Sequence, residues 1–156
     1  MAANIGIPSK HLQPLATMLN TLLADEYLLY TKTRNYHWNV RGPQFMDLHK
    51  FFESQYEELA EIVDQVAERN RSLGHFAVGT MKQYLNLTRL TEDDKATNAK
   101  QMLQNLLNDH ETIVRVLRKD IVAAVEKYKD AGTSDFLTGL MEQHEKMAWF
   151  IRSYLE

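Results

Sequence analysis

Apolar residues recur every three or four positions along most of this chain, which is the spacing of amphipathic α-helices. Stretches with this pattern cover about residues 13–39, 45–73 and 96–130, and a fourth, capped by Thr133 or Ser134, continues to about residue 155. No segment alternates apolar and polar residues as a β-strand would, and no internal repeat is present. The pattern therefore predicts an all-α protein with four long helices.

The connections between these stretches differ in length, and this constrains the topology. The segment Arg41–Pro43 is a short turn between the first two helices, and Gly74 is a suitable C-terminal cap for the second. Residues 75–94 are too long for a simple hairpin and carry a short helix near residues 81–85. These lengths predict a four-helix bundle with a short helix in the long crossover between helices two and three.

Length and composition indicate one ordinary globular domain spanning residues 1–156. Hydrophobic residues make up 44% and charged residues 25% of the chain, and the net charge is −3. The absence of cysteine excludes disulfide bonds and thiolate metal ligands. Neither a secretory leader nor a run of about 20 apolar residues is visible, so we expect a cytoplasmic protein with no membrane segment.

One face of the second helix carries the residues most suggestive of chemistry. His49 is followed by Glu53, Asp64 and Glu68, which lie at about 40°, 60° and 100° from it on a helical wheel. His37 lies a short distance upstream. Imidazoles and carboxylates together are suitable ligands for iron and similar divalent metals. His49 and Asp64 are nevertheless about 22 Å apart along the axis, so one copy of this helix cannot place all four groups around one metal.

A second copy of the helix removes this difficulty, because the spacing is palindromic. The positions of His49 and Glu68 have the same midpoint as those of Glu53 and Asp64, close to Leu59. Two antiparallel copies related by a two-fold axis near Leu59 would place His49 opposite Glu68, and Glu53 opposite Asp64. A two-fold interface is self-complementary, so the pattern predicts two equivalent metal sites between subunits.

The opposite face of the same helix is apolar and is expected to contact the core. Its residues are Leu48, Phe52, Leu59, Ile62, Val63, Val66 and Leu73. The acidic face therefore points away from the core, and the ordinary interpretation is a solvated charged surface. The nearby His37 favours a ligand set instead. So does the absence of Arg and Lys from this face, since a solvated helix would pair them with the acids at i+4.

A set of residues around the first turn and the second helix resembles the ferroxidase signature of the Dps family of mini-ferritins. The matching residues are His37, Trp38, Asn39, Arg41, Gly42, His49, Glu53, Asp64 and Glu68. The resemblance extends over essentially the whole chain and implies a ferritin-like four-helix bundle that assembles into a hollow dodecamer. It implies oxidation of Fe²⁺, preferably by hydrogen peroxide, and storage of the ferric mineral inside.

Carried over by position, the resemblance assigns His37, His49 and Glu53 to one subunit and Asp64 and Glu68 to its two-fold mate. The family usually has Asp where this chain has Glu53, which keeps a carboxylate with one more methylene. The resemblance also favours a redox role for Trp38 beside the iron, to which Tyr36 could contribute. The alternative for Trp38 is a packing role.

Two further groups of residues invite a functional interpretation. His110 and His144 lie on the apolar stripes of the third and fourth helices, where histidine is more often a hydrogen-bonded core residue; with Glu26 they would form a di-metal site inside the bundle. No Glu-x-x-His motif supports that site. Near the start of the fourth helix, the acidic residues are Asp130, Asp135 and Glu142. These carboxylates are suited either to interact with the dipole of the fourth helix or to line a cation pore. Asp135 is the best candidate for a pore-lining residue.

Two alternatives to an iron-storage ferroxidase remain open at this point. The first is a DNA-compacting protein whose metal site is secondary. The net charge of −3 and the single lysine, Lys10, among the first eleven residues favour weak or absent DNA binding. The chain also ends on its last helix without a basic tail. The second alternative is a structural shell protein with a vestigial site, against which the intact ligand set argues.

Overall fold

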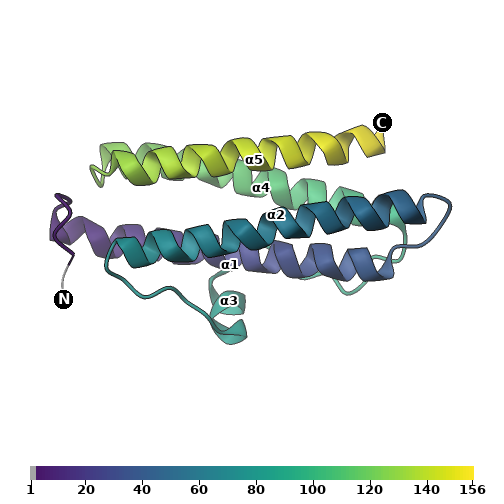
Figure 1. The fold of residues 1–156 in the computed structure, drawn as a ribbon, viewed down its shortest axis with the longest axis horizontal. Helices are drawn as coiled ribbons and strands as arrows, with labels where there is room; N and C mark the ends of the chain where they lie inside the picture. The colour runs from purple at the N-terminus through teal and green to yellow at the C-terminus, as the bar shows by residue number, and fades with distance from the viewer. Residues whose placement is uncertain (1–2) are drawn as a thin grey trace.

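Five helices make up most of the protein, of which the computed structural model describes residues 3–156 (Figure 1). They are α1 (Ser9–Asn39), α2 (Phe45–Ser72), α3 (Met81–Leu87), α4 (Ala99–Glu126) and α5 (Ala131–Leu155). Residues 3–156 contain no β-strand. The all-α fold, with a short helix between the second and third long helices, is confirmed.

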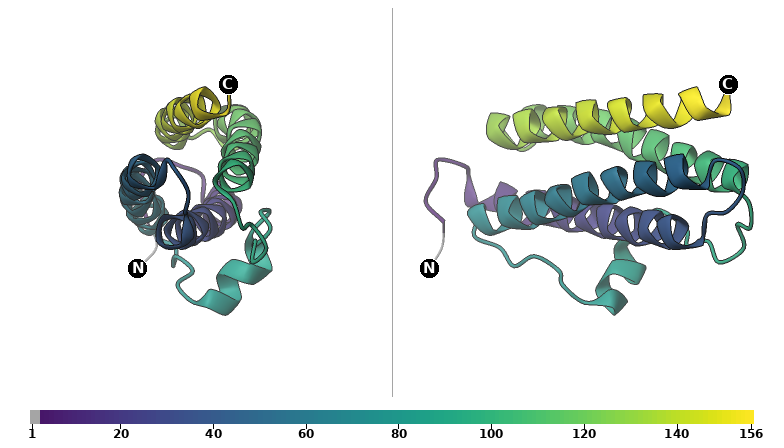
Figure 2. Two further views of the ribbon diagram at one scale, coloured as in Figure 1. Left: turned by 90° about the vertical axis from the view of Figure 1, so that its right-hand side faces the viewer. Right: turned by 45° about the vertical axis from the view of Figure 1, so that its right-hand side comes forward.

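The four long helices form two pairs. Helix α1 packs along α2, α4 packs along α5, and the two pairs lie against one another with the core between them (Figures 1 and 2). The tight turn after α1 makes α2 antiparallel to it. The segment between α2 and α4 returns along the outside of the bundle, and its helix α3 packs on α1.

The apolar stripes predicted from the sequence form the core. On α2 the predicted apolar residues are buried, except that Val63 is half-buried. The largest fully buried side chains include Tyr36, Phe52, Leu15, Leu19, Leu29 and Ile62. Helical spacing places Val125 on the apolar stripe of the third long helix, but this residue is 44% exposed, whereas the adjacent Ala124 is buried.

The first and last long helices begin earlier than the sequence pattern indicates. Helix α1 begins at Ser9 with Pro8 as its N-cap residue, and the backbone N–H of His11 donates to the Pro8 carbonyl at 2.8 Å. Pro14 therefore lies inside the helix, where its missing N–H leaves the Lys10 carbonyl unpaired in the helix. Lys10 lies in the exposed first turn, so water can take the place of that bond.

Helix α5 is capped by Asp130, not by Thr133 or Ser134. The Asp130 carboxylate accepts a hydrogen bond from the backbone N–H of Thr133 at 3.0 Å. Thr133 and Ser134 are buried within the first turn. Asp is as good an N-cap as Ser or Thr, and the helix takes its cap three or four residues earlier than the sequence pattern indicates.

The turn between α1 and α2 brings the ends of these helices together. Gly42 has φ +121°, a conformation that residues with a Cβ rarely adopt. The backbone N–H of Phe45 donates to the Gly42 carbonyl at 3.0 Å and closes the turn. As a result, the last turn of α1, with His37, lies beside the N-terminal part of α2, with His49.

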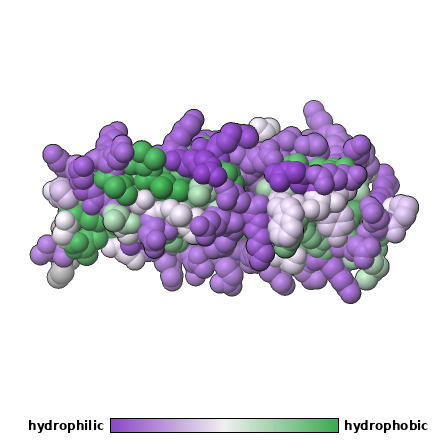
Figure 3. All heavy atoms as spheres, turned by 90° about the horizontal axis from the view of Figure 1, so that it is seen from above, coloured by the Kyte–Doolittle hydropathy of each residue, from purple (hydrophilic) through white to green (hydrophobic). Residues whose placement is uncertain are grey.

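Most of the surface seen over α5 and α4 is hydrophilic, with an apolar patch near the end where α5 begins (Figure 3). Val122 and Val125, in the last turns of α4, are exposed apolar residues of that end. Within residues 3–156, no helix combines the length and the apolar character needed to cross a membrane.

Candidate metal centre

His37 and His49 form a tightly coupled pair at the junction of α1 and α2. Their rings are stacked, with centroids 3.8 Å apart and planes at 19°. The Nδ1 of His37 lies 2.8 Å from the His49 carbonyl oxygen, and the Nδ1 of His49 lies 2.9 Å from the His37 carbonyl oxygen. Each imidazole is thus held by the backbone of the other residue.

These two hydrogen bonds define the chemistry of both rings. A carbonyl oxygen only accepts, so each Nδ1 must carry the proton and donate it. In the neutral ring the Nε2 atom then has a free lone pair, which is the form that binds a metal, and a backbone carbonyl is a common outer partner for such a ligand. The His37 carbonyl lies in the last turn of α1, where the helix itself supplies no donor. The hydrogen bond from His49 therefore pairs the His37 carbonyl, and the two hydrogen bonds together leave the Nε2 atom of each ring free to bind a metal.

Aromatic rings surround the histidine pair. Phe45 stacks on the other side of His49, with centroids 5.1 Å apart. Tyr56, two turns further along α2, packs on His37 in a T-shaped arrangement, with ring centroids 5.3 Å apart and ring planes at 78°. Burial, followed by the charges of Glu53 and Glu57, raises the pKa of Tyr56. Tyr56 is therefore a neutral phenol beside His37 at physiological pH.

The three predicted carboxylate ligands lie on the outward face of α2. Glu53 is half-buried, one turn beyond His49, whereas Asp64 and Glu68 are exposed. The apolar face of α2 is buried against the bundle, so the acidic face points outward as predicted. Helix geometry keeps Asp64 about 22 Å from His49 along the axis. The structure of one chain brings His37 and His49 together and leaves Asp64 and Glu68 apart from them.

No cluster of three or more His, Cys, Asp or Glu side chains suited to a metal ion occurs within residues 3–156 of one chain. The donor set present at the α1–α2 junction is two imidazoles and the nearby Glu53. Such a set fits Fe²⁺ in chemical type but offers too few protein ligands to complete its coordination.

Trp38 and Tyr36 point away from the histidine pair. The indole of Trp38 is 63% exposed, and the guanidinium carbon of Arg34 lies 4.9 Å from its ring centroid. The Tyr36 ring is buried, and its hydroxyl donates to Asp93 at 2.5 Å. Within one chain, Tyr56 is therefore the aromatic residue beside His37. Sequence reasoning did not find it, although its position seven residues after His49, on the same helix face, was a usable signal.

A second histidine pair lies in the centre of the bundle. His110 of α4, His144 of α5 and Glu26 of α1 are each 0% exposed. The two Nδ1 atoms are 3.0 Å apart, and the Nε2 of His144 lies 3.0 Å from Glu26 Oε1. Burial, followed by the charge of His144, lowers the pKa of His110 well below its usual value. The three groups form a linear hydrogen-bonded chain rather than a convergent set of ligands.

The acidic residues near the start of α5 have different environments. Asp130 is 5% exposed and forms a salt bridge with Arg69 at 3.1 Å. Burial alone would raise its pKa, but hydrogen bonds from Thr133 and the charge of Arg69 lower the pKa instead. Asp130 is thus a helix cap held by an ion pair and is unsuited to lining a pore. Asp135 and Glu142 are exposed and stay pore candidates.

Comparison with known proteins agrees with this architecture. The sequence model of the ferritin-like domain family matches residues 16–156 of this chain. A low temperature-induced protein of Nostoc sp. is 46% identical over 98% of this chain and 86% of its own length. The DNA protection during starvation protein 2 of Bacillus anthracis is 38% identical over 88% of this chain and 94% of its own length.

A solved structure shows the same similarity in three dimensions. The Dps protein from Vibrio cholerae O1, described as a member of a broad superfamily of ferritin-like diiron-carboxylate proteins, superposes with a TM-score of 0.94 at 30% sequence identity. The alignment covers 100% of this chain and 98% of that one. The fold and these matches define the class as ferritin-like helical-bundle proteins. Within that class, the chain belongs to the Dps family.

Proposed function

We propose that this protein is a ferroxidase that oxidises Fe²⁺ with hydrogen peroxide at sites shared between two subunits. The observation that carries the proposal is the His37–His49 pair, whose hydrogen bonds leave both Nε2 atoms free as ligands. Family membership supports iron as the substrate, because the related Vibrio cholerae protein is described as belonging to the diiron-carboxylate superfamily.

The partner chain would complete the site. His37, His49 and Glu53 come from one subunit, and Asp64 and Glu68 come from the two-fold mate. The palindromic spacing on α2 supports this division, since antiparallel copies of the helix bring each half-set opposite the other. The exposure of Asp64 and Glu68 in the single chain leaves them accessible to such a partner.

The chemistry follows from two Fe²⁺ ions held close together. Each gives one electron to the same peroxide, so that two Fe²⁺ and one H₂O₂ yield two Fe³⁺ and two hydroxide ions. The carboxylates offset the charge of the hard cations, while the imidazoles complete the coordination and tune the potential. Because both electrons are delivered at one site, the O–O bond is cleaved without release of hydroxyl radical.

The assembly would store the oxidised product. We propose a dodecameric hollow shell built from the two-fold dimers, with ferric mineral inside, acting in the cytoplasm against peroxide damage. Asp135 and Glu142 are exposed acidic groups suited to attracting Fe²⁺ toward a pore. Trp38 keeps its proposed redox role only if it approaches the iron of an adjoining subunit, because within its own chain it packs on Arg34.

The stoichiometry of the reaction tests this proposal. Anaerobic shells loaded with Fe²⁺ should consume one peroxide for every two Fe²⁺ oxidised, with little spin-trapped hydroxyl radical. Their native mass should be that of a dodecamer, and oxidation by peroxide should be faster than by dissolved oxygen. A one-to-one stoichiometry with abundant hydroxyl radical would contradict the paired-iron site. Shells that oxidise Fe²⁺ no faster than free solution would contradict the ferroxidase function itself.

A further inference from the structure

Four tyrosines form an unbroken series of rings that begins at the histidine pair. Tyr56 lies 5.3 Å from His37, and Tyr30 lies 6.2 Å from Tyr56. Tyr27 follows at 5.9 Å from Tyr30, and Tyr84 stacks on Tyr27 at 4.3 Å with planes at 16°. All these distances join ring centroids. The series passes from α2 to α1 and ends on α3.

The helical spacing of α1 explains why the series exists. Tyr27, Tyr30, Arg34 and His37 follow one another at intervals of three or four residues, so they share one stripe of the helix. The side chain of Tyr56 crosses from α2 to this stripe. The series therefore follows a rigid helix surface, and its rings keep their relative positions.

Arg34 fixes the rings in the middle of the series. Its guanidinium carbon lies 5.5 Å from the Tyr30 ring, 5.4 Å from the Tyr56 ring and 4.9 Å from the Trp38 ring. It also donates a hydrogen bond to the Tyr30 hydroxyl at 2.8 Å. Cation–π contacts of this kind stabilise a defined ring arrangement, which a series of loosely packed tyrosines would lack.

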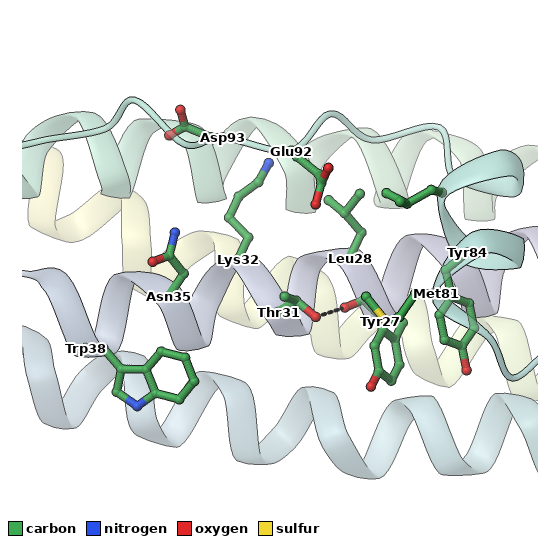
Figure 4. Close-up of a pocket in the computed structure, with 11 residues that line it drawn as sticks. Tyr27, Leu28, Thr31, Lys32, Asn35, Trp38, Met81, Tyr84, Glu92 and Asp93 are labelled. Carbon is green, nitrogen blue, oxygen red and sulfur yellow. Dashed lines mark hydrogen bonds between the residues drawn. The ribbon is translucent and has the colours of Figure 1, made fainter.

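The series ends beside a pocket between α1 and α3. Tyr27 and Tyr84 line this pocket, and their rings lie next to one another there (Figure 4). Tyr84 is 9% exposed, and its hydroxyl donates to the Val78 carbonyl at 3.3 Å. The last two rings are thus stacked, and Tyr27 lies about 15 Å along α1 from His37.

We propose that the series Tyr56–Tyr30–Tyr27–Tyr84 carries oxidising equivalents away from the iron site to the stacked Tyr27–Tyr84 pair. The inference rests on the proposed ferroxidase function. It concerns the case in which a site holds only one Fe²⁺ when peroxide arrives, so that peroxide receives one electron instead of two. The oxidising product would otherwise attack His37, His49 and the neighbouring backbone.

One Fe²⁺ and one H₂O₂ give Fe³⁺, hydroxide and a hydroxyl radical, and the radical removes a hydrogen atom from Tyr56 to form water and a tyrosyl radical. Each tyrosine in turn reduces the preceding radical, losing its phenol proton to water while the preceding ring regains one. When two such events deliver radicals to Tyr27 and Tyr84, the two rings couple through a carbon–carbon bond to form dityrosine. The oxidant is peroxide throughout, and no further reductant is needed.

Replacing the middle of the series tests the inference. Tyr30→Phe removes a redox-active phenol but keeps the ring between Tyr56 and Tyr27, and it removes none of the proposed ligands. The matched control is Tyr154→Phe, because Tyr154, near the C-terminus of α5, packs on Phe51 and not on a ring of the series. Assembled shells of each variant receive repeated additions of Fe²⁺, each smaller than the number of sites, in the presence of excess peroxide, so that one chain can undergo two one-electron events. Fe²⁺ oxidation, tyrosyl radical by freeze-quench spin resonance and cross-linked peptides by mass spectrometry are then measured.

The unmodified protein and Tyr154→Phe should form dityrosine between Tyr27 and Tyr84. Tyr30→Phe should lose most of that product, several-fold, with radical retained at Tyr56 and more oxidation of His37 and His49. Equal cross-linking in Tyr30→Phe and Tyr154→Phe, or its absence in the unmodified protein, overturns the inference while normal Fe²⁺ oxidation leaves the ferroxidase function standing. Failure of the unmodified shells to oxidise Fe²⁺ overturns both.

Discussion

The two histidine pairs of this protein use the same chemical group in opposite ways. His37 and His49 stack at the end of the bundle, with each Nδ1 bound to a backbone carbonyl and each Nε2 free. His110 and His144 lie at 0% exposure in the centre and bind each other through Nδ1. A metal ligand needs a free nitrogen and access for the ion, and only the first pair combines both.

The two histidine pairs also differ in how well their buried polar atoms are hydrogen-bonded, and therefore in what they contribute to stability. In the outer pair, His49 donates to the His37 carbonyl, which the end of α1 leaves without a helical donor. The inner pair requires a buried carboxylate, Glu26, whose second oxygen has no hydrogen-bond partner, and the Nε2 of His110 also has none. Unpaired buried polar atoms are costly. We therefore expect substitutions at the outer pair to affect reaction with iron and substitutions at the inner cluster to affect stability.

The largest expected effect is on iron oxidation after loss of an outer imidazole. His49→Ala removes one proposed ligand and the donor that holds the His37 carbonyl. Because even outer-shell changes at metal sites cost about 10–100-fold, peroxide-dependent Fe²⁺ oxidation should fall at least about tenfold. Stopped-flow absorbance of assembled shells measures the rate. His75→Ala, in the crossover, is the control and should leave the rate unchanged; a matching loss there would show that the effect is not specific to the site.

The next effect separates the inner cluster from the outer one. Glu26→Ala leaves His144 buried without its acceptor and opens a cavity in the core. Together these changes should lower the free energy of unfolding by about 2–4 kcal/mol, seen as a lower thermal midpoint. Glu26→Gln keeps the acceptor oxygen and should lose less. Shells of either variant that remain assembled should still oxidise Fe²⁺ at the normal rate. A large rate loss in stable Glu26→Gln shells would give the inner cluster a part in the chemistry.

The inner pair should also make stability depend on pH. The pKa of His110 is lowered in the folded protein, so below the unfolded value of about 6.5 the unfolded chain binds a proton that the folded chain does not. The contribution of neutral His110 to the free energy of unfolding is therefore complete above that pH. It decreases as the pH drops from about 6.5 toward the lowered pKa of His110. Thermal midpoints between neutral and mildly acidic pH measure this, and His110→Leu should flatten the slope. An unchanged slope in that variant would mean that other groups control the transition.

Helix patterns and spacing were sufficient to predict most of the fold. The apolar stripe containing Leu48, Phe52 and Ile62 correctly identified the core face of α2, because burial of one helix face imposes a local period. The helix starts at Ser9 and Ala131 were missed, since helix ends depend on individual caps such as Pro8 and Asp130. Local sequence specifies these only weakly.

The candidate site was predictable only in part. The shared face of His49 and Glu53 follows from helix geometry, but the stacking of His37 on His49 depends on how two helices are aligned across the Gly42 turn. The contact of Glu26 with His144 joins α1 to α5, and that of His37 with Tyr56 joins α1 to α2. Both depend on a tertiary alignment that a single sequence does not state. The metal-binding role of the ligand set stays a prediction.

The smallest expected effect is on nucleic acid. The net charge of −3 offers little attraction for phosphates, and non-specific affinity depends on such attraction and falls steeply with salt. A gel shift with plasmid DNA at about 150 mM salt, where charges are screened beyond ~8 Å, should show no retention at neutral pH. Tight retention under those conditions would favour DNA compaction as a principal activity and the iron site as secondary.

Complementation between two inactive variants tests the central claim most directly. His49→Ala/Glu53→Ala subunits are co-assembled with Asp64→Ala/Glu68→Ala subunits, so that each mixed dimer contains one intact site and one site lacking all four groups. Random equal mixing should make about one quarter of all sites intact. The account predicts that mixed shells, verified by native mass, recover a corresponding fraction of peroxide-dependent Fe²⁺ oxidation, while each parent shell has none. Verified mixed shells as inactive as their parents would contradict a site shared between subunits.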